Sequence, residues 1–196
     1  MSETLSAPAA LRLVILVGSV REGRFGPTVA RWFADVAAGR EDWTVDVVDL
    51  ADPALALPLG MGEAGPEQEA LAARLGAADA FVVVTPEYNH SYPAGLKNVI
   101  DWHREEWQAK PVGFVSYGGL SGGLRAVEHL RPVFAELHTV TVRDTVSFHG
   151  AWSCFGDDGT PLDPEACGGA AKVLLDQLAW WADALRAARA RRPYAA

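Results

Sequence analysis

Cysteine is scarce in this chain of 196 residues, which contains only Cys154 and Cys167. Two cysteines are too few for a disulfide-rich secreted scaffold, and their spacing does not match a metal site. The N-terminus also lacks the positively charged segment of a signal peptide. We therefore expect a reducing, cytoplasmic location in which both thiols are free and no metal is bound.

Long hydrophobic runs are absent as well, and basic residues are in the minority. The first apolar run, 11–17, is about a third of the length that spans a bilayer. Lys and Arg total 17 against 25 Asp and Glu, which gives a formal net charge of −8. Because an acidic chain repels phosphate backbones, the sequence disfavours nucleic-acid partners, and no membrane partner is expected. A local site for a small anion stays compatible with this charge.

Apolar and helical segments alternate along the chain. The segments 11–17, 43–50, 80–85, 111–117 and 139–142 predict strands, with a continuation of the last towards Phe148 left open. The first, third and fourth are nearly continuous hydrophobics, as in strands that are buried on both faces. Helical patterns fill the intervals, and Ser91 is the predicted N-cap of the helix that follows segment 80–85.

This alternation implies right-handed crossovers between parallel strands. We expect one α/β domain over residues 11–190, a three-layer, flavodoxin-like, doubly wound parallel sheet of five strands in the order 2-1-3-4-5. Residues 1–10 and 191–196 are expected to be tails. In such a sheet, ligands bind beyond the carboxyl ends of the strands.

The first loop of interest covers 18–27 and reads Gly-Ser-Val-Arg-Glu-Gly-Arg-Phe-Gly-Pro. Its backbone N–H groups and the following helix would face a phosphate, with Ser19 adding a hydroxyl and Arg21 or Arg24 a charge-assisted contact. The spacing fits neither a Walker A motif nor the dinucleotide fingerprint. The alternative is a glycine-rich turn with solvated arginines, but the position at the switch point of the sheet favours a phosphate site.

Two further loops follow neighbouring buried strands. Residues 85–93 bring aromatic, amide and carboxylate groups that can border a flat heteroaromatic ring, although Tyr88 and Tyr92 could instead pack on the sheet. We expect His90 to be an ordinary loop residue rather than an acid that takes part in a reaction. Residues 116–123 contain four glycines, which would let the backbone approach a ligand closely. The three loops together predict one site for a phosphate-bearing planar ligand.

Three motifs resemble those of the NAD(P)H-dependent FMN reductases of the flavodoxin-like superfamily, over most of residues 11–150. They lie at 18–26, at 85–101 and at 116–119, and the middle one, Thr-Pro-Glu-Tyr-Asn-His-Ser-Tyr-Pro-Ala-Gly-Leu-Lys-Asn-Val-Ile-Asp, is the most specific. The resemblance implies bound FMN whose phosphate is held by Ser19, Arg21, Phe25 and Gly26. It also implies that the isoalloxazine is bordered by Pro86, Glu87, Tyr88 and Asn89. Its pyrimidine side would be reached by Ser116, Tyr117, Gly118 and Gly119.

The resemblance implies a reaction in which NAD(P)H passes hydride to the flavin. A quinone-like or other small oxidised acceptor would then be reduced on the same face by ping-pong kinetics. The flavin carries the chemistry, so no catalytic side chain is assigned. The alternatives are a flavodoxin-type one-electron carrier, which the first two loops oppose, and a flavin-binding regulator without turnover.

Members of this family are typically dimers or tetramers, so the resemblance also implies a homodimer or homotetramer. Trp102 and Trp107 are candidates for the subunit surface, and packing in the core of one chain is the alternative for both. The resemblance assigns no role to residues 148–163.

Overall fold

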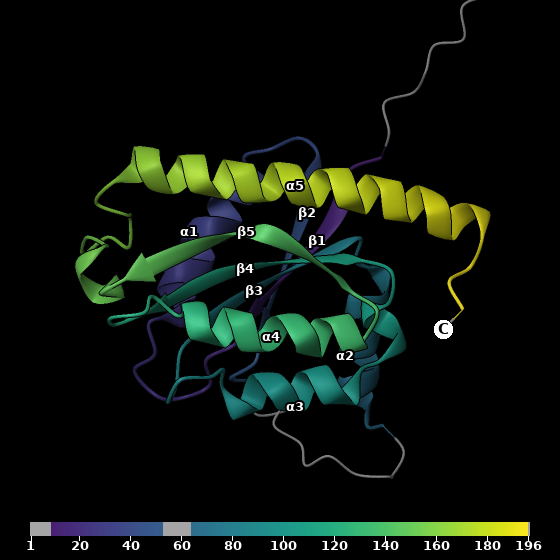
Figure 1. Cartoon of the computed structure of the whole chain (residues 1–196), viewed down its shortest axis with the longest axis horizontal. Helices are drawn as coiled ribbons and strands as arrows, with labels where there is room; N and C mark the ends of the chain where they lie inside the picture. Colours follow the sequence, from purple (N-terminus) through teal and green to yellow (C-terminus); the bar gives the residue numbers. More distant parts are fainter. Residues whose placement is uncertain (1–8, 53–63, 196) are drawn as a thin grey trace, which may run out of the picture.

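One parallel sheet of five strands organises the described part of the chain (Figure 1). The strands are β1 (Leu11–Val17), β2 (Trp43–Asp49), β3 (Ala80–Pro86), β4 (Pro111–Gly118) and β5 (Val140–His149). Their order, β2-β1-β3-β4-β5, confirms the predicted 2-1-3-4-5 topology. The computed structural model describes residues 9–52 and 64–195, so most of the predicted tail at 1–10 lies outside the described residues.

Helices cover both faces of the sheet, which makes three layers (Figure 1). They are α1 (Gly26–Ala38), α2 (Pro66–Ala77), α3 (Ala94–Trp102), α4 (Leu124–Glu136) and α5 (Pro164–Arg191). One buried cluster joins α1 and α5 to the sheet, and a second joins α2, α3 and α4 to the opposite face. Within residues 9–52 and 64–195, no helix is long and apolar enough to cross a membrane.

Burial explains why some strands are apolar throughout and others are apolar only at intervals. Every residue of β3 is buried, and only Arg12 of β1 is exposed, because both strands lie inside the sheet with helices on each side. The edge strands β2 and β5 are buried only at intervals. β5 extends to His149, so the continuation of the last strand towards Phe148 is confirmed.

The predicted N-cap at Ser91 is wrong. α3 begins at Ala94 with Pro93 as its N-cap residue. The backbone N–H of Ser91 donates to Tyr88 O at 3.0 Å, and that of Tyr88 donates to Ser91 O at 2.8 Å. These two bonds close a tight turn before the helix, so Ser91 belongs to the turn.

Trp107, in the short 3-10 helix η2 (Glu105–Trp107), is a core residue. Its indole N–H donates to Ile100 O at 3.2 Å, and its ring packs edge-on against Phe81 and Phe134. Because the side chain is fully buried within one chain, it cannot form a subunit surface. The alternative interpretation, a core tryptophan, is confirmed for Trp107.

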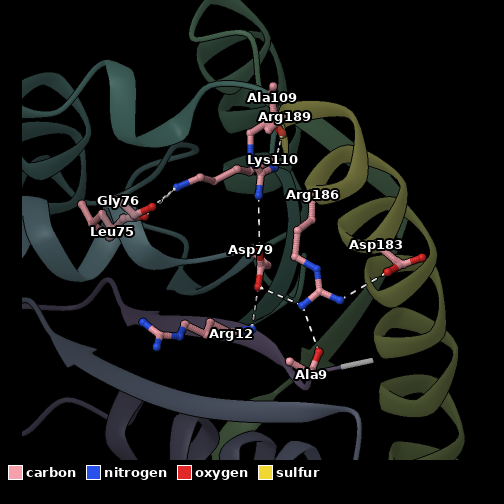
Figure 2. Close-up of polar contacts among 10 residues, drawn as sticks. All are labelled: Ala9, Arg12, Leu75, Gly76, Asp79, Ala109, Lys110, Asp183, Arg186 and Arg189. Carbon is pink, nitrogen blue, oxygen red and sulfur yellow. Dashed lines mark hydrogen bonds and ion pairs between the residues drawn. The ribbon is translucent and has the colours of Figure 1, made fainter. Parts of the chain in front are cut away.

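Charged side chains hold the C-terminal part of α5 at the end of the sheet where the strands begin (Figure 2). Asp79 accepts a hydrogen bond from Arg189 at 3.1 Å. The Lys110 ammonium donates to Leu75 O at 2.8 Å and to Gly76 O at 2.9 Å, near the end of α2, and burial lowers the pKa of Lys110 to about 8. A cavity of about 880 Å³ opens beside these groups, but Lys110 and Arg189 are already bonded to protein oxygen atoms.

Candidate cofactor site

The three loops singled out in the sequence lie together at the carboxyl edge of the sheet. They follow the adjacent strands β1, β3 and β4 and lead into α1, α3 and α4. The N–H of Gly18 donates to Val84 O at 2.8 Å, which joins the first loop to β3. A Cβ placed on Gly118 would lie 3.9 Å from Cβ of Glu87, so the second and third loops are also in contact.

Two buried hydroxyl groups meet at the start of α1. Ser19 is fully buried and Tyr117 is 4% exposed, and neither Ser19 Oγ nor Tyr117 Oη has a hydrogen-bond partner in the described part of the chain. A Cβ on Gly26 would lie 2.7 Å from Tyr117 Oη and in contact with Ser19 Oγ, so glycine leaves the space in front of both groups open. Burial raises the pKa of Tyr117 to about 12 although the adjacent Ser19 hydroxyl acts to lower it, so the Tyr117 hydroxyl stays protonated and can donate.

The N-terminus of α1 has no side-chain cap bond within residues 9–52 and 64–195. Phe25 is the N-cap residue and makes no side-chain cap bond, and the first turn contains no acidic side chain. Pro27 has no N–H, and the N–H groups of Thr28 and Val29 donate to Phe25 O at 3.1 and 3.5 Å, which leaves the N–H of Gly26 at the start of the helix together with the positive end of the helix dipole. Together with Ser19 and Tyr117, it forms a donor set that fits a phosphate group.

Arg21 and Arg24, both predicted to face a phosphate, lie in different environments. The Arg21 guanidinium is exposed and lies 5.1 Å from the ring centroid of Tyr88 on the second loop. Arg24 instead donates to both carboxylate oxygens of Asp49, at 2.6 and 2.8 Å, and to Ser19 O at 2.9 Å. Arg21 is therefore the guanidinium that is free to reach an anion, whereas Arg24 fixes the loop to the end of β2.

Glu87 joins two of the loops. Its side chain is 10% exposed, and its carboxylate accepts bonds from Ser121 Oγ, from Arg125 Nη1 at 2.9 Å and from Arg125 N–H at 3.3 Å. Burial acts to raise the pKa of Glu87, but these donors outweigh it and hold the pKa below its ordinary value. Glu87 stays ionised and clamps the loop after β3 to the start of α4.

The remainder of the second loop is a rigid turn. Asn89 and His90 have positive φ angles of 48° and 73°, between the paired residues Tyr88 and Ser91. Positive φ at both central residues is typical of a type I′ turn, which is tightly defined. Pro86 ends β3 and is paired in register with Tyr117, which brings this turn beside the hydroxyl pair.

The third loop folds back on the end of β4. Gly122 and Gly123 have φ angles of 59° and 83°, and a Cβ on Gly123 would lie 2.9 Å from Tyr117 N. Ser116 Oγ donates to Gly122 O at 2.8 Å, so this hydroxyl holds the loop rather than facing outwards. Gly118 lies against Gly122, Gly123 and Glu87, whereas a Cβ on Gly119 would meet only Trp152, at 3.9 Å, so Gly119 has no side chain to hinder close approach to its backbone.

Residues far along the chain complete the site. Phe25 packs edge-on against Tyr117 and Phe155, with ring centroids 6.2 and 5.4 Å apart. Trp152, in the 3-10 helix η3 (Ala151–Ser153), lies beside Gly119 and is 68% exposed. Leu120, the residue that follows Gly119, is 92% exposed. These two apolar side chains border the loops that were predicted to hold the ligand.

The sequence reasoning missed Asp49, Ser121 and Arg125, which hold the loops by hydrogen bonds. For Asp49 a signal was available, because it lies one residue before the end of the second predicted strand, 43–50, beside the strand that leads into the arginine-containing loop. For Ser121 and Arg125 no signal was available, because their partner Glu87 lies more than 30 positions away.

The donor set described above fits FMN. Ser19 Oγ, Tyr117 Oη and the uncapped N-terminus of α1 offer donors to one phosphate. The rigid turn at 88–91 and the glycine-containing third loop lie beside this donor set and suit a flat ring. Among the described residues, no group of three or more His, Cys, Asp or Glu could hold a metal ion.

Comparison with known proteins identifies similar sequences. A family model described as NADPH-dependent FMN reductase matches residues 11–153. An NAD(P)H-dependent FMN reductase of Schizosaccharomyces pombe is 40% identical over 121 residues, which cover 57% of this chain and 60% of that protein. A probable NADPH:quinone oxidoreductase 2 of Oryza sativa is 31% identical over 83% of this chain and 85% of its own length. The quinone reductase of Escherichia coli is 37% identical over 67% of this chain and 73% of its own length.

A solved structure supports the fold. The flavoenzyme NAD(P)H:(acceptor) oxidoreductase FerB from Paracoccus denitrificans superposes with a TM-score of 0.71 at 23% identity. The superposition covers 89% of this chain and 98% of FerB. The three-layer arrangement is therefore shared over nearly the whole described chain.

Proposed function

Because the chain belongs to the NADPH-dependent FMN reductase family, we propose that it oxidises NAD(P)H through bound FMN and reduces a small quinone-like acceptor. Bound FMN would supply the redox chemistry by taking hydride from NAD(P)H and passing two electrons to the acceptor. The residues of this chain would bind the cofactor, orient it and stabilise its charge.

The observation that carries this proposal is the pair of unpartnered buried oxygen atoms, Ser19 Oγ and Tyr117 Oη, at the uncapped N-terminus of α1. An unsatisfied buried polar group costs about 1–3 kcal/mol, so such groups are expected to have a partner when the protein works. A phosphate would accept from both hydroxyls at once and would lie at the positive end of the α1 dipole. Gly26 keeps the space for it open.

The other loop residues would act as positioning groups. Arg21 would add a charge-assisted contact to the phosphate, while Arg24 and Asp49 hold the loop in shape. The Glu87 clamp would keep the second and third loops at a fixed separation on either side of the ring. Backbone N–H groups at Gly118 and Gly119 would stabilise negative charge on the reduced cofactor.

The exposed side chains Leu120 and Trp152 support an apolar, planar acceptor. They stand at the edge of the third loop with 92% and 68% of their surface exposed. A quinone could cover both, which would remove apolar surface from water. The names of the rice and Escherichia coli relatives agree with this acceptor class.

The flavodoxin-type electron carrier is not favoured. The first loop is a glycine- and arginine-containing loop, and the family model that matches residues 11–153 is that of a reductase.

We also propose a cytoplasmic location, which the two free thiols of Cys154 and Cys167 support.

Anaerobic mixing tests the proposal. Protein loaded with FMN and mixed with excess NADPH or NADH should lose the flavin absorbance near 450 nm within seconds, and a quinone should restore it. Denaturation should release FMN. Release of FAD as the tight ligand, or slow bleaching combined with rapid one-electron exchange, would contradict the assignment.

A further inference from the structure

His149, the last residue of β5, holds the third loop through its side-chain ring. β5 ends beside β4, where His149 is paired in register with Gly118 (Figure 1). Nδ1 of His149 lies 3.0 Å from Leu120 O, and Nε2 lies 3.3 Å from Ser147 Oγ. The loop also packs on the ring, since a Cβ on Gly122 would lie 2.6 Å from His149 Cδ2. The end of β5 therefore fixes the loop that carries the exposed Leu120 side chain.

The bonding partners of His149 determine where its hydrogen atoms lie. A carbonyl oxygen only accepts, so Nδ1 must carry a hydrogen to bond to Leu120 O. Ser147 Oγ donates its single hydrogen to Gly122 O at 2.9 Å. This hydroxyl can then only accept from Nε2, which requires a second hydrogen on the ring. All three bonds therefore exist together only when His149 is protonated and positively charged.

Loss of this proton removes one bond from the network. A neutral His149 that keeps its bond to Leu120 O has no hydrogen on Nε2, so Nε2 can only accept. Ser147 Oγ must then turn its hydrogen from Gly122 O to the ring, or the ring loses its bond to Ser147. The bond from a neutral ring to Leu120 O is also weaker than the bond from a charged ring. The third loop is therefore held less firmly when His149 is neutral.

His149 is the group of this network that changes charge near neutral pH. It is exposed to water, and histidine ordinarily titrates between about pH 5 and 8. Other charged or titratable groups around the third loop are Glu87 and His90 of the second loop, Arg125 of α4 and Cys154 after β5.

These neighbouring groups do not supply the same change in charge. Although burial acts to raise the pKa of Glu87, its donors hold that pKa below the ordinary value, so Glu87 stays ionised. The Arg125 guanidinium keeps its proton. Cys154 Sγ donates to His149 O at 3.2 Å, which requires a neutral thiol. His90 titrates as well, but among the described residues it makes no hydrogen bond to the third loop, so a His149 variant separates the two histidines.

We propose that His149 is a positioning residue for the electron acceptor, and that its charged form holds Leu120 and Trp152 at a fixed separation for a planar apolar ring. This inference rests on the proposed function, because it concerns the acceptor side of that site. His149 lies between the two apolar side chains: its ring bonds to Leu120 O, and Trp152 follows three positions later in η3. The N–H of Gly150 donates to Gly119 O at 2.9 Å, which joins the same two segments. The acceptor is therefore bound more tightly when His149 is protonated.

Nuclear magnetic resonance of the full chain, with and without FMN, tests the network directly. The carbonyl carbon signals of Leu120 and Gly122 should move between about pH 5 and 8 with the same midpoint as the His149 ring. In His149→Asn both signals should become independent of pH. In Ser147→Ala the Gly122 signal should become independent of pH while the Leu120 signal still moves. Carbonyl signals that do not follow the His149 ring in the parent would overturn the inference.

His138→Asn is the matched control. His138 lies just before β5 and bonds to Tyr194 Oη at 2.7 Å, away from the third loop. Its φ angle is 59°, which asparagine also adopts readily, so the backbone should be unchanged. Both carbonyl signals should titrate in this variant as in the parent.

Steady-state kinetics test the effect on the acceptor. With menadione, a quinone that does not titrate in this range, KM should rise about three- to fivefold from pH 5 to pH 8, as expected for the loss of one hydrogen bond. The rise should be absent in His149→Asn and Ser147→Ala and present in His138→Asn. Flavin that NADPH does not bleach would overturn the proposed function and with it the acceptor role of His149. Rapid bleaching combined with a KM for menadione that does not change with pH would overturn only the role of His149.

Discussion

Arg24 and Asp49 form a two-pronged ion pair that joins the loop after β1 to the end of β2. The same guanidinium holds Ser19 O at 2.9 Å, so the pair sets the position of a residue whose hydroxyl faces the candidate phosphate site. The sequence suggested that Arg21 or Arg24 contacts the phosphate. In the structure Arg24 holds the loop that carries Ser19.

Asp49→Asn should weaken FMN binding because it releases the loop that carries Ser19. We expect the dissociation constant to rise about five- to tenfold, because Ser19 loses a fixed position at a cost of ~1–1.4 kcal/mol. Stability should fall by only ~0.5–1 kcal/mol, since the pair is partly exposed. Asp42→Asn is the matched control, because it breaks the similar Arg40–Asp42 pair away from the site. Fluorescence titration measures both, and equal FMN affinity in the two variants would contradict the role of Arg24.

Arg21→Ala should also weaken FMN binding, with the fold unchanged. A charge-assisted contact to phosphate contributes ~1.5–3 kcal/mol, so the dissociation constant should rise about ten- to hundredfold. Riboflavin, which has no phosphate, should bind the parent and the variant equally. A variant that titrates with FMN like the parent would mean that Arg21 is only solvated.

Tyr117→Phe should have opposite effects on the empty and the loaded protein. Without FMN, the change removes a buried hydroxyl that has no partner, so the free energy of unfolding should rise or stay the same. With FMN, a donor to the phosphate is lost and affinity should fall. Urea unfolding with and without FMN measures both. A variant that is destabilised without FMN would show that the hydroxyl already has a partner.

Stability should depend on Lys110 between about pH 8 and the ordinary lysine pKa of about 10.4. Burial lowers the pKa in the folded state, so the unfolded chain binds more protons in this window and stability rises with pH. Lys110→Met removes this contribution. The free energy of unfolding of the parent minus that of Lys110→Met should therefore increase from pH 8 to pH 10. A constant difference would mean that Lys110 keeps an ordinary pKa.

Turnover should follow ping-pong kinetics. The phosphate loop and the third loop would enclose the rest of the flavin, so the one open face near Tyr88 and Asn89 would serve NAD(P)H and acceptor in turn. Double-reciprocal plots at several quinone concentrations should give parallel lines. Intersecting lines would indicate a ternary complex, with Trp152 the first place to look for a second surface.

The sequence by itself determined the fold and indicated one edge of the sheet for the candidate site. Continuous apolar segments such as 80–85 marked the buried strands, because a strand covered on both faces has no polar side. The alternation of five strands with helices, joined by right-handed crossovers, favoured the doubly wound order 2-1-3-4-5, and the loop motifs after β1, β3 and β4 marked one edge of the sheet. These are local patterns and topological rules, which a sequence shows directly.

Only the tertiary structure decided what individual side chains do. Arg21 and Arg24 lie three positions apart in one loop, yet one is exposed and the other is bound to Asp49, because β2 ends beside Arg24. Likewise Trp107 became a core residue through contacts with Phe81 and Phe134. Such roles depend on partners that are distant in the sequence, and no local pattern specifies them.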